Sequence, residues 1–170
     1  MHTDAKSILV MGVSGSGKSH IGRQVAAAID ATFIDADDYH SAANVAKMAR
    51  GEPLTDDDRA AWLQVLADLY RRYRTAGQSL VIGCSALKRR YRDRLRQGAP
   101  DLQILYLHGS RNLLLQRLDN RDDHFFAGAH MLDSQLATLE VPDETEAFRC
   151  NVRSPPREIV EAFTARLRST

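Results

Sequence analysis

The sequence has little that points away from an ordinary globular protein. It contains two cysteines in 170 residues, and a chain of this length buries enough apolar surface to fold without disulfides. A disulfide scaffold is therefore excluded, and Cys84 and Cys150 are expected to be reduced, buried thiols. Charge of one sign is not in excess either: 23 Lys and Arg against 22 Asp and Glu give a net charge of +1. This balance excludes the basic surface typical of proteins that bind nucleic acid or anionic membranes.

Long apolar runs and targeting segments are also missing. No run approaches the roughly 18 apolar residues that a membrane-spanning helix requires. The first residues, MHTDAKS, lack the basic and apolar regions of a secretory signal. There is no internal repeat, low-complexity tract or linker. We expect one cytoplasmic domain over residues 1–170, with neither nucleic acid nor membrane as a partner.

Short aliphatic runs alternate with amphipathic segments along the whole chain. The runs predict buried strands, and the segments with apolar residues three or four apart predict helices. This order indicates an α/β fold with three layers, in which helices cover both faces of a parallel sheet of about five strands. The predicted strands are 7–11, 32–34, 80–84, 104–107 and, less regular, 147–152. The first predicted helix follows residue 19, and the others cover 55–75, a basic segment before 104, 113–118 and 154–167.

A complete G-x-x-x-x-G-K-[ST] motif lies between the first predicted strand and the first predicted helix. Glycines let the backbone curl so that successive N–H groups point inward, and the positive end of the helix attracts a polyphosphate. The lysine is expected to reach the β- and γ-phosphates of ATP, and the final hydroxyl to bind Mg²⁺. The motif consists of Gly12, Val13, Ser14, Gly15, Ser16, Gly17, Lys18 and Ser19.

Other residues favour a kinase over a GTPase switch. No Asp is followed by Gly three positions later, so the segment that couples a switch loop to the γ-phosphate is missing. A kinase needs a carboxylate beside the acceptor hydroxyl. Asp35 and Asp37 follow the second predicted strand, at the sheet edge where ligands bind in open α/β folds, and are predicted to face the motif. A regulator that binds nucleotide without chemistry remains the alternative from another class.

Two further segments are predicted to complete the site. A polar, alanine-rich insertion at about 38–60 is expected above the sheet, where it would bind the acceptor. Arg117 and Arg121 lie four residues apart and lead into a polar segment, about 119–132, that is predicted to act as a lid over ATP. Their guanidinium groups are candidates to neutralise charge on the phosphoryl group in transfer.

Beyond the motif, the chain resembles the gluconokinases of the P-loop class. The combination of G-E-P-L-x-D-D-D-R and C-S-A-L-K in one such chain is highly specific. The segments that carry the resemblance are MGVSGSGKS (11–19), DAD (35–37) with His40, KMARGEPLTDDDRAAW (47–62), CSALKRRYRD (84–93), HFF (124–126) and residues 131–140.

The resemblance implies a shikimate-kinase-like fold, a homodimer, and Mg²⁺-dependent transfer of the γ-phosphate of ATP to the 6-hydroxyl of D-gluconate. Other kinases of small acceptors, for shikimate, adenylylsulfate or a nucleoside monophosphate, are the nearest alternative. Gluconate is a polyol with one carboxylate, so its pocket needs a cationic fork and several hydrogen-bonding groups. The candidates are Arg59, Lys88 and Arg92 for the carboxylate and His40 and Asp57 for hydroxyls.

The roles expected in catalysis follow the same resemblance. Asp37 is expected to orient the acceptor hydroxyl and take its proton, and Asp35 to help hold Mg²⁺ with Ser19, although the two aspartates could exchange roles. Lys18 and Arg121 are expected to stabilise the charge on the phosphoryl oxygens.

Overall fold

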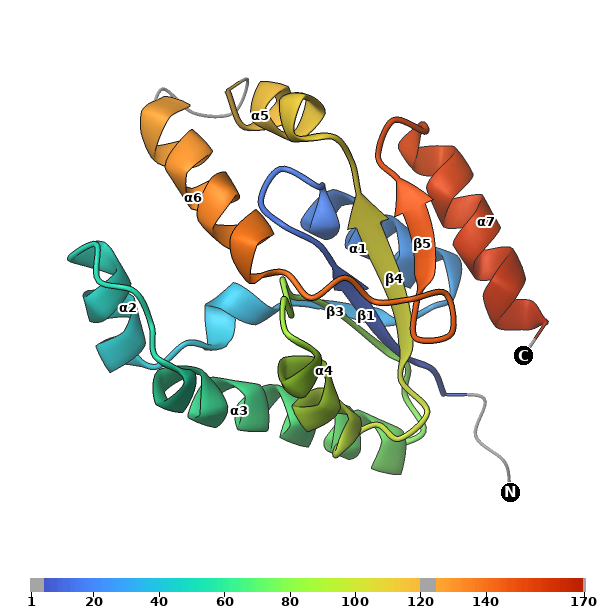
Figure 1. Ribbon diagram of the computed structural model, residues 1–170. Helices are drawn as coiled ribbons and strands as arrows, with labels where there is room; N and C mark the ends of the chain where they lie inside the picture. Colours follow the sequence, from blue (N-terminus) through green and yellow to red (C-terminus); the bar gives the residue numbers. More distant parts are fainter. Residues whose placement is uncertain (1–4, 120–124, 170) are drawn as a thin grey trace.

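A parallel five-stranded sheet forms the centre of the computed structural model, which describes residues 5–119 and 125–169 (Figure 1). The strand order is β2-β3-β1-β4-β5, so β1 is central, and every strand pairs in parallel with its neighbours. The carboxyl ends of all strands therefore meet at one edge of the sheet. The strands are β1 (Ser7–Met11), β2 (Thr32–Asp35), β3 (Leu80–Gly83), β4 (Gln103–His108) and β5 (Phe148–Asn151).

Helices cover both faces of this sheet. In chain order they are α1 (Lys18–Ala28), the 3₁₀ turn η1 (Ala36–Tyr39), α2 (Ala42–Ala49), α3 (Asp56–Thr75), α4 (Arg89–Arg96), α5 (Arg111–Asp119), α6 (Phe125–Thr138) and α7 (Pro156–Arg168). Figure 1 shows α3 and α4 together on one face, and α1 and α7 on the other.

Burial on both faces explains why the sequence of the central strand, β1, is apolar without alternation. Leu9 and Met11 belong to the core cluster under α3 and α4, whereas Ile8 and Val10 belong to the cluster under α1 and α7. All four side chains have no exposed surface. A strand covered on both faces has no solvent side, so every position favours an apolar residue.

The structure confirms the predicted α/β class, the parallel sheet and the positions of all predicted strands to within a residue or two. The helix predicted over 55–75 is α3, which begins with a capping box formed by Thr55 and Asp58. Cys84 is buried as expected, whereas Cys150 is only partly buried, and both are free thiols. Among the described residues, no helix combines the length and apolar character needed to cross a membrane.

The predicted lid is where sequence and structure differ. The sequence predicts no helix between residues 118 and 154, but residues 125–132 form the start of α6. Leu132 on this helix is fully buried in the core that also contains Leu114 of α5. The tertiary contact therefore supplies the stability that the local pattern did not predict.

The capping box of α3 has a measurable pH dependence. Hydrogen bonds, first from the Lys47 ammonium and then from the Thr55 backbone N–H, lower the pKa of Asp58 from 3.8 to about 2. A lowered folded-state pKa means that the stabilisation is complete above the unfolded value and is lost as pH falls toward 2. We expect Asp58→Asn to lower the unfolding midpoint by roughly a few degrees at pH 7, and this deficit to shrink between pH 4 and pH 2.

Thermal unfolding in a pH series measures the effect. Asp57→Asn is the matched control, because the Asp57 side chain is exposed on the same helical turn and outside the capping box. If Asp58→Asn lowered the unfolding midpoint by the same amount at every pH, the lowered pKa assigned to Asp58 would be contradicted.

Candidate active site

The glycine-rich motif forms the turn between β1 and α1 at the carboxyl edge of the sheet. Gly15 and Gly17 have φ angles of 85° and 88°, in the left-handed region that favours glycine. A Cβ atom at Gly15 would also lie 2.8 Å from the Leu114 carbonyl oxygen. Within the turn, the Ser16 N–H donates to the Val13 carbonyl at 3.2 Å, and Lys18 Nζ donates to the same oxygen at 3.2 Å. The predicted strand-turn-helix context is therefore confirmed.

The N-terminus of α1 suits an anion. Its cap residue, Gly17, makes no side-chain hydrogen bond to the helix, and its first turn contains no acidic residue. By contrast, α3 is capped by its own Thr55 and has three aspartates in its first turn. Ser16 Oγ is buried without a hydrogen-bond partner among the described residues. The N–H groups at a helix N-terminus and the helix dipole together favour a phosphate at this position.

Asp35 links the motif to the neighbouring strand. Ser19 Oγ donates to Asp35 Oδ2 at 3.2 Å, and Asp35 Oδ1 accepts the Asp37 backbone N–H at 3.0 Å. Asp35 therefore caps the 3₁₀ turn η1 and faces the first turn of α1, which places it beside the motif as predicted. No cluster of three or more His, Cys, Asp or Glu side chains suited to a metal occurs in 5–119 or 125–169. A Ser hydroxyl with one carboxylate fits Mg²⁺ that arrives with its phosphate ligands.

Asp37 is an accessible carboxylate in a negative environment. Its side chain is 83% exposed. The surrounding protein atoms withdraw it partly from water and, with the nearby Asp35 carboxylate, raise its pKa above the ordinary value, while His40 and Lys18 act in the opposite direction. A raised pKa makes the carboxylate a stronger proton acceptor.

His40 is held rigidly beside Asp37. Its ring stacks on Trp62 with centroids 4.1 Å apart, and Trp62 Nε1 donates to the Ala36 carbonyl at 2.8 Å. The His40 side chain is only 5% exposed, and Nε2 lies 3.9 Å from Asp37 Oδ1. Burial lowers its pKa, which Asp37 partly offsets and Arg59 reinforces. Nδ1 is buried without a hydrogen-bond partner within the described part of the chain.

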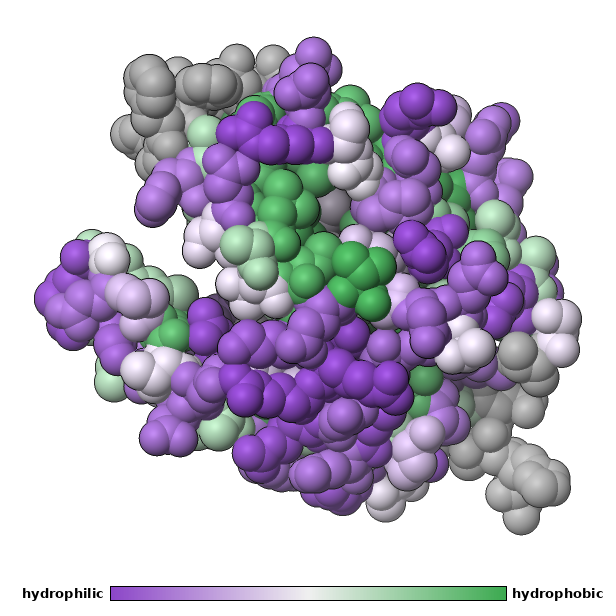
Figure 2. Space-filling model, viewed as in Figure 1, coloured by the Kyte–Doolittle hydropathy of each residue, from purple (hydrophilic) through white to green (hydrophobic). Residues whose placement is uncertain are grey.

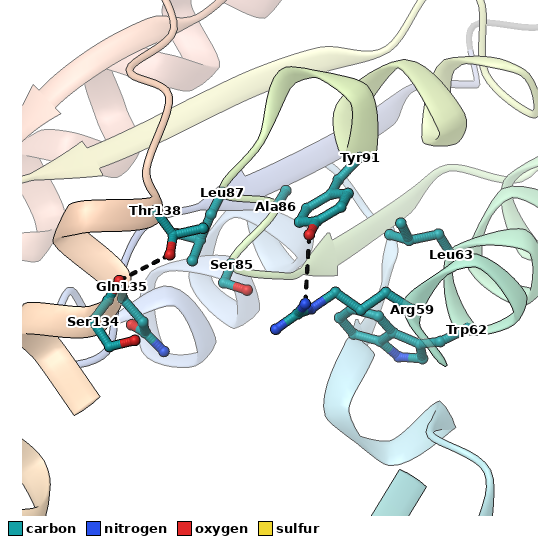
Figure 3. Close-up of a pocket in the computed structure, with 10 residues that line it drawn as sticks. All are labelled: Arg59, Trp62, Leu63, Ser85, Ala86, Leu87, Tyr91, Ser134, Gln135 and Thr138. Atoms are coloured by element: carbon teal, nitrogen blue, oxygen red, sulfur yellow. Dashed lines mark hydrogen bonds between the residues drawn. The ribbon is translucent and has the colours of Figure 1, made fainter. Parts of the chain in front are cut away.

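A pocket opens between α3, the segment after β3, and α6 (Figure 3). Arg59 reaches into it from α3: Nη1 donates to the Leu54 carbonyl at 2.8 Å and approaches Tyr91 Oη at 3.5 Å. Its Nε and Nη2 groups have no protein partner among the described residues, so one edge of the guanidinium remains for a carboxylate. The other lining residues are Trp62, Leu63, Ser85, Ala86, Leu87, Tyr91, Ser134, Gln135 and Thr138.

A cationic cluster surrounds Tyr91 at the side of this pocket. The charged groups of Arg59, Lys88 and Arg90 lie 5.6 to 5.8 Å from the centre of its ring. Asp56 accepts a 2.7 Å hydrogen bond from Tyr91 Oη and pairs with Arg90 and, at 3.8 Å, with Lys88. The Tyr91 hydrogen bond and these cations lower the pKa of Asp56. Asp56 therefore offsets part of the charge of Lys88 and Arg90, and Arg59 remains the cation best placed for a ligand.

The prediction that Arg92 binds a substrate carboxylate is wrong. Arg92 is 1% exposed and forms a two-pronged pair with Glu146, with Nε to Oε2 at 2.8 Å and Nη2 to Oε1 at 3.2 Å. Its remaining N–H groups donate to the carbonyls of Ala86, Leu87 and Glu140. All five donors are occupied, so Arg92 supports the structure instead.

The remaining predicted residues are placed as follows. Asp57 is exposed on the first turn of α3. Arg117 Nη2 donates to the Val152 carbonyl at 2.5 Å, which ties α5 to the end of β5. Arg121 lies outside the described residues. Tyr91 and Gln135 also line the pocket; both occur in segments that carry the resemblance, but their local sequence predicts no role for them.

Comparison with known proteins identifies the family. A family model described as an AAA domain matches residues 8–142. The thermoresistant gluconokinase of Escherichia coli (strain K12) is 45% identical over 155 residues, which cover 89% of this chain and 87% of that protein. The chain belongs to the gluconokinase family. A crystal structure of a gluconokinase from Sinorhizobium meliloti 1021 agrees, with 43% identity and a TM-score of 0.85 over 99% of this chain and 94% of that one.

The wider fold prediction is confirmed as well. A shikimate kinase from Aquifex aeolicus vf5 shares the fold with a TM-score of 0.56 over 96% of both chains, at 15% identity. Membership of the gluconokinase family makes the chain a P-loop kinase, and the alternative of a regulator without chemistry is not favoured.

Proposed function

We propose that this protein transfers the γ-phosphate of ATP to the 6-hydroxyl of D-gluconate, giving 6-phospho-D-gluconate and ADP. The observation that carries the proposal is the pocket beside the phosphate-binding turn, into which Arg59 directs an unpaired guanidinium edge. A linear polyol with one terminal carboxylate fits a site with one cation at the far end and polar groups along its wall. Membership of the gluconokinase family supports the same acceptor.

In this proposal the nucleotide is held by the backbone of the turn. The N–H groups of the turn other than those of Ser14 and Ser16, which donate to Gln135 and Val13, bind the phosphates. Lys18 leaves the Val13 carbonyl to contact the β- and γ-phosphates. Ser19 and Asp35 would hold Mg²⁺, which offsets the charge of the phosphates when bound. Arg117, which precedes the predicted lid, and Arg121 within it would add positive charge around the nucleotide.

Asp37 and His40 are the proposed acceptor-activating pair. Asp37 orients the 6-hydroxyl and takes its proton as the oxygen attacks the γ-phosphorus, the bond to the bridging oxygen breaks, and ADP leaves. Stacking on Trp62 fixes the His40 ring beside Asp37, where we propose that it contacts an acceptor hydroxyl. Asp57 and Lys88 are proposed to contact the acceptor from the rim of the pocket. We also propose that the enzyme acts as a homodimer in the cytoplasm, as the family resemblance suggests.

An assay of ADP release with and without gluconate tests the proposed function. We expect ADP release to depend on gluconate, and phosphorus NMR to show a phosphomonoester on the terminal hydroxyl. Shikimate, adenylylsulfate and nucleoside monophosphates serve as alternative acceptors in the same assay. ADP release that depends on one of these and not on gluconate would overturn the assignment.

Arg59 is expected to govern affinity for the acceptor. A charge-assisted hydrogen bond contributes about 1.5–3 kcal/mol, or roughly 10- to 150-fold in binding. Arg59→Leu should therefore raise the gluconate KM about 10- to 100-fold and leave the ATP KM within about threefold. Arg59→Lys should recover only part of this loss, because an ammonium lacks the planar fork.

Steady-state kinetics with each substrate varied in turn makes the measurement. Arg50→Leu is the matched control, since Arg50 is exposed and pairs only with Glu52 among the described residues. An Arg59→Leu enzyme with an unchanged gluconate KM would remove Arg59 from the acceptor site.

A further inference from the structure

Gln135 on α6 connects the phosphate-binding turn to the acceptor pocket. The backbone N–H of Ser14, the third residue of the motif, donates to Gln135 Oε1 at 2.7 Å across 121 residues of sequence. The same side chain lines the pocket that contains Arg59. Figure 3 shows Gln135 and Arg59 on opposite sides of one open space, with Ser85 between them.

The two ends of this amide have different surroundings. Oε1 is used by the turn, whereas the two N–H groups of Nε2 have no partner within the described part of the chain. An amide carries two donors on its nitrogen, and leaving them without a partner after a ligand excludes water is costly. A ligand in the pocket would therefore gain a donor whose position is fixed by the turn.

We propose that Gln135 is an acceptor-binding, specificity-determining residue that donates through Nε2 to the gluconate hydroxyl next to the one phosphorylated. This inference rests on the proposed function. If the carboxylate at carbon 1 lies on Arg59 and the 6-hydroxyl lies at the γ-phosphate, the chain of the acceptor runs from Arg59 toward the turn. Gln135 contacts the turn itself, so it lies at the carbon-5 end of the acceptor.

Two substitutions separate this role from simple support of the turn. Gln135→Glu keeps an oxygen to accept the Ser14 N–H but loses both donors, whereas Gln135→Met removes both functions at similar size. If Gln135 only held the turn, Gln135→Glu would change the gluconate KM no more than its added charge does, and it would discriminate between acceptors as the wild type does. We expect instead that both variants raise the gluconate KM about tenfold or more, with the larger effect in Gln135→Glu, whose charge repels an anionic acceptor.

Discrimination between acceptors gives a readout that a purely structural role would not move. The ratio of kcat/KM for gluconate to kcat/KM for its carbon-5 epimer should fall about tenfold in Gln135→Met, because this variant lacks the donor that bonds the carbon-5 hydroxyl. The ratio of gluconate to its carbon-2 epimer should stay within about twofold. Gln78→Met is the matched control, since Gln78 is exposed at the opposite edge of the sheet, before β3.

The outcomes are distinct. Wild-type enzyme without gluconate-dependent ADP release overturns the proposed function itself. Wild-type turnover together with an unchanged gluconate KM and an unchanged carbon-5 ratio in both variants overturns the role of Gln135 alone. A raised KM in Gln135→Met with normal behaviour of Gln135→Glu also overturns it, because the turn contact would then explain the effect.

Discussion

Replacing Asp37 by asparagine is expected to lower kcat by about 10²-fold or more while leaving ATP binding near normal. An asparagine keeps the size of the side chain and can still contact a hydroxyl, but it cannot accept the proton that the hydroxyl loses. The Asp37 side chain is accessible, and its raised pKa reflects the surrounding protein atoms and the neighbouring Asp35 carboxylate. The substitution removes this base without disturbing the core.

The adjacent Asp38 provides a matched control. It is exposed on the same 3₁₀ turn, so Asp38→Asn changes the net charge equally and should retain kcat within about twofold. Nucleotide affinity is measured separately by titration with a fluorescent ATP analogue. Near-normal turnover of Asp37→Asn would remove Asp37 from the mechanism and transfer the role of base to Asp35, which already accepts hydrogen bonds from Ser19 and from the Asp37 backbone.

The parts of the fold that could be predicted are those specified by local sequence. The strands β1, β3 and β4 contain apolar runs because both sheet faces are covered there. The phosphate-binding turn is a contiguous motif whose glycines match left-handed backbone at positions 15 and 17. The capping box before α3 is equally local. Such features need no knowledge of distant residues.

Features that depend on pairs far apart in the chain could not be predicted in this way. Nothing local in the basic segment of α4 shows that Arg92 is buried while Arg89 and Arg90 are exposed. Burial of Arg92 is decided by Glu146, 54 residues away. The contact of Gln135 with Ser14 spans 121 residues. The start of α6 likewise depends on the packing of Leu132 into the core.

Separation along the sequence also explains why the candidate site was predicted only in part. Asp35 was placed correctly beside the motif because strand ends in a parallel sheet share an edge. The pocket itself is assembled from α3, α6 and the segment after β3, which approach one another only in the folded chain. The residues that form its hydrogen-bonding wall could therefore be identified only from the structure.

Removing the Arg92 guanidinium is expected to destabilise the protein by about 3 kcal/mol or more. Breaking a buried ion pair typically costs 3–5 kcal/mol, because the remaining charge stays buried. Burial alone would raise the pKa of Glu146, but hydrogen bonds from Arg92 and Arg96 outweigh it and hold the pKa below its usual range. Without Arg92, Arg96 at 2.8 Å is the one cation that still pairs with Glu146 among the described residues, which places the expected loss toward the lower end.

Arg92 also holds the wall of the acceptor pocket. Its Nη1 bonds the carbonyls of Ala86 and Leu87, and Ala86 has a φ of 46°, an uncommon left-handed conformation for a residue with a Cβ atom. Backbone strain of this kind persists only where the surroundings fix it. Arg92→Leu should therefore raise the gluconate KM as well, through displacement of Ser85 and Leu87, although Arg92 does not touch the acceptor.

Urea unfolding monitored by the single tryptophan, Trp62, measures the loss of stability. Arg89→Leu is the matched control: Arg89 is exposed on the same helix, and its replacement should change the free energy of unfolding by less than about 0.5 kcal/mol. The double variant Arg92→Leu with Glu146→Leu should recover part of the loss, since no unpaired carboxylate then remains buried. If Arg92→Leu alone matched the wild type, the ion pair would not be what fixes the pocket wall.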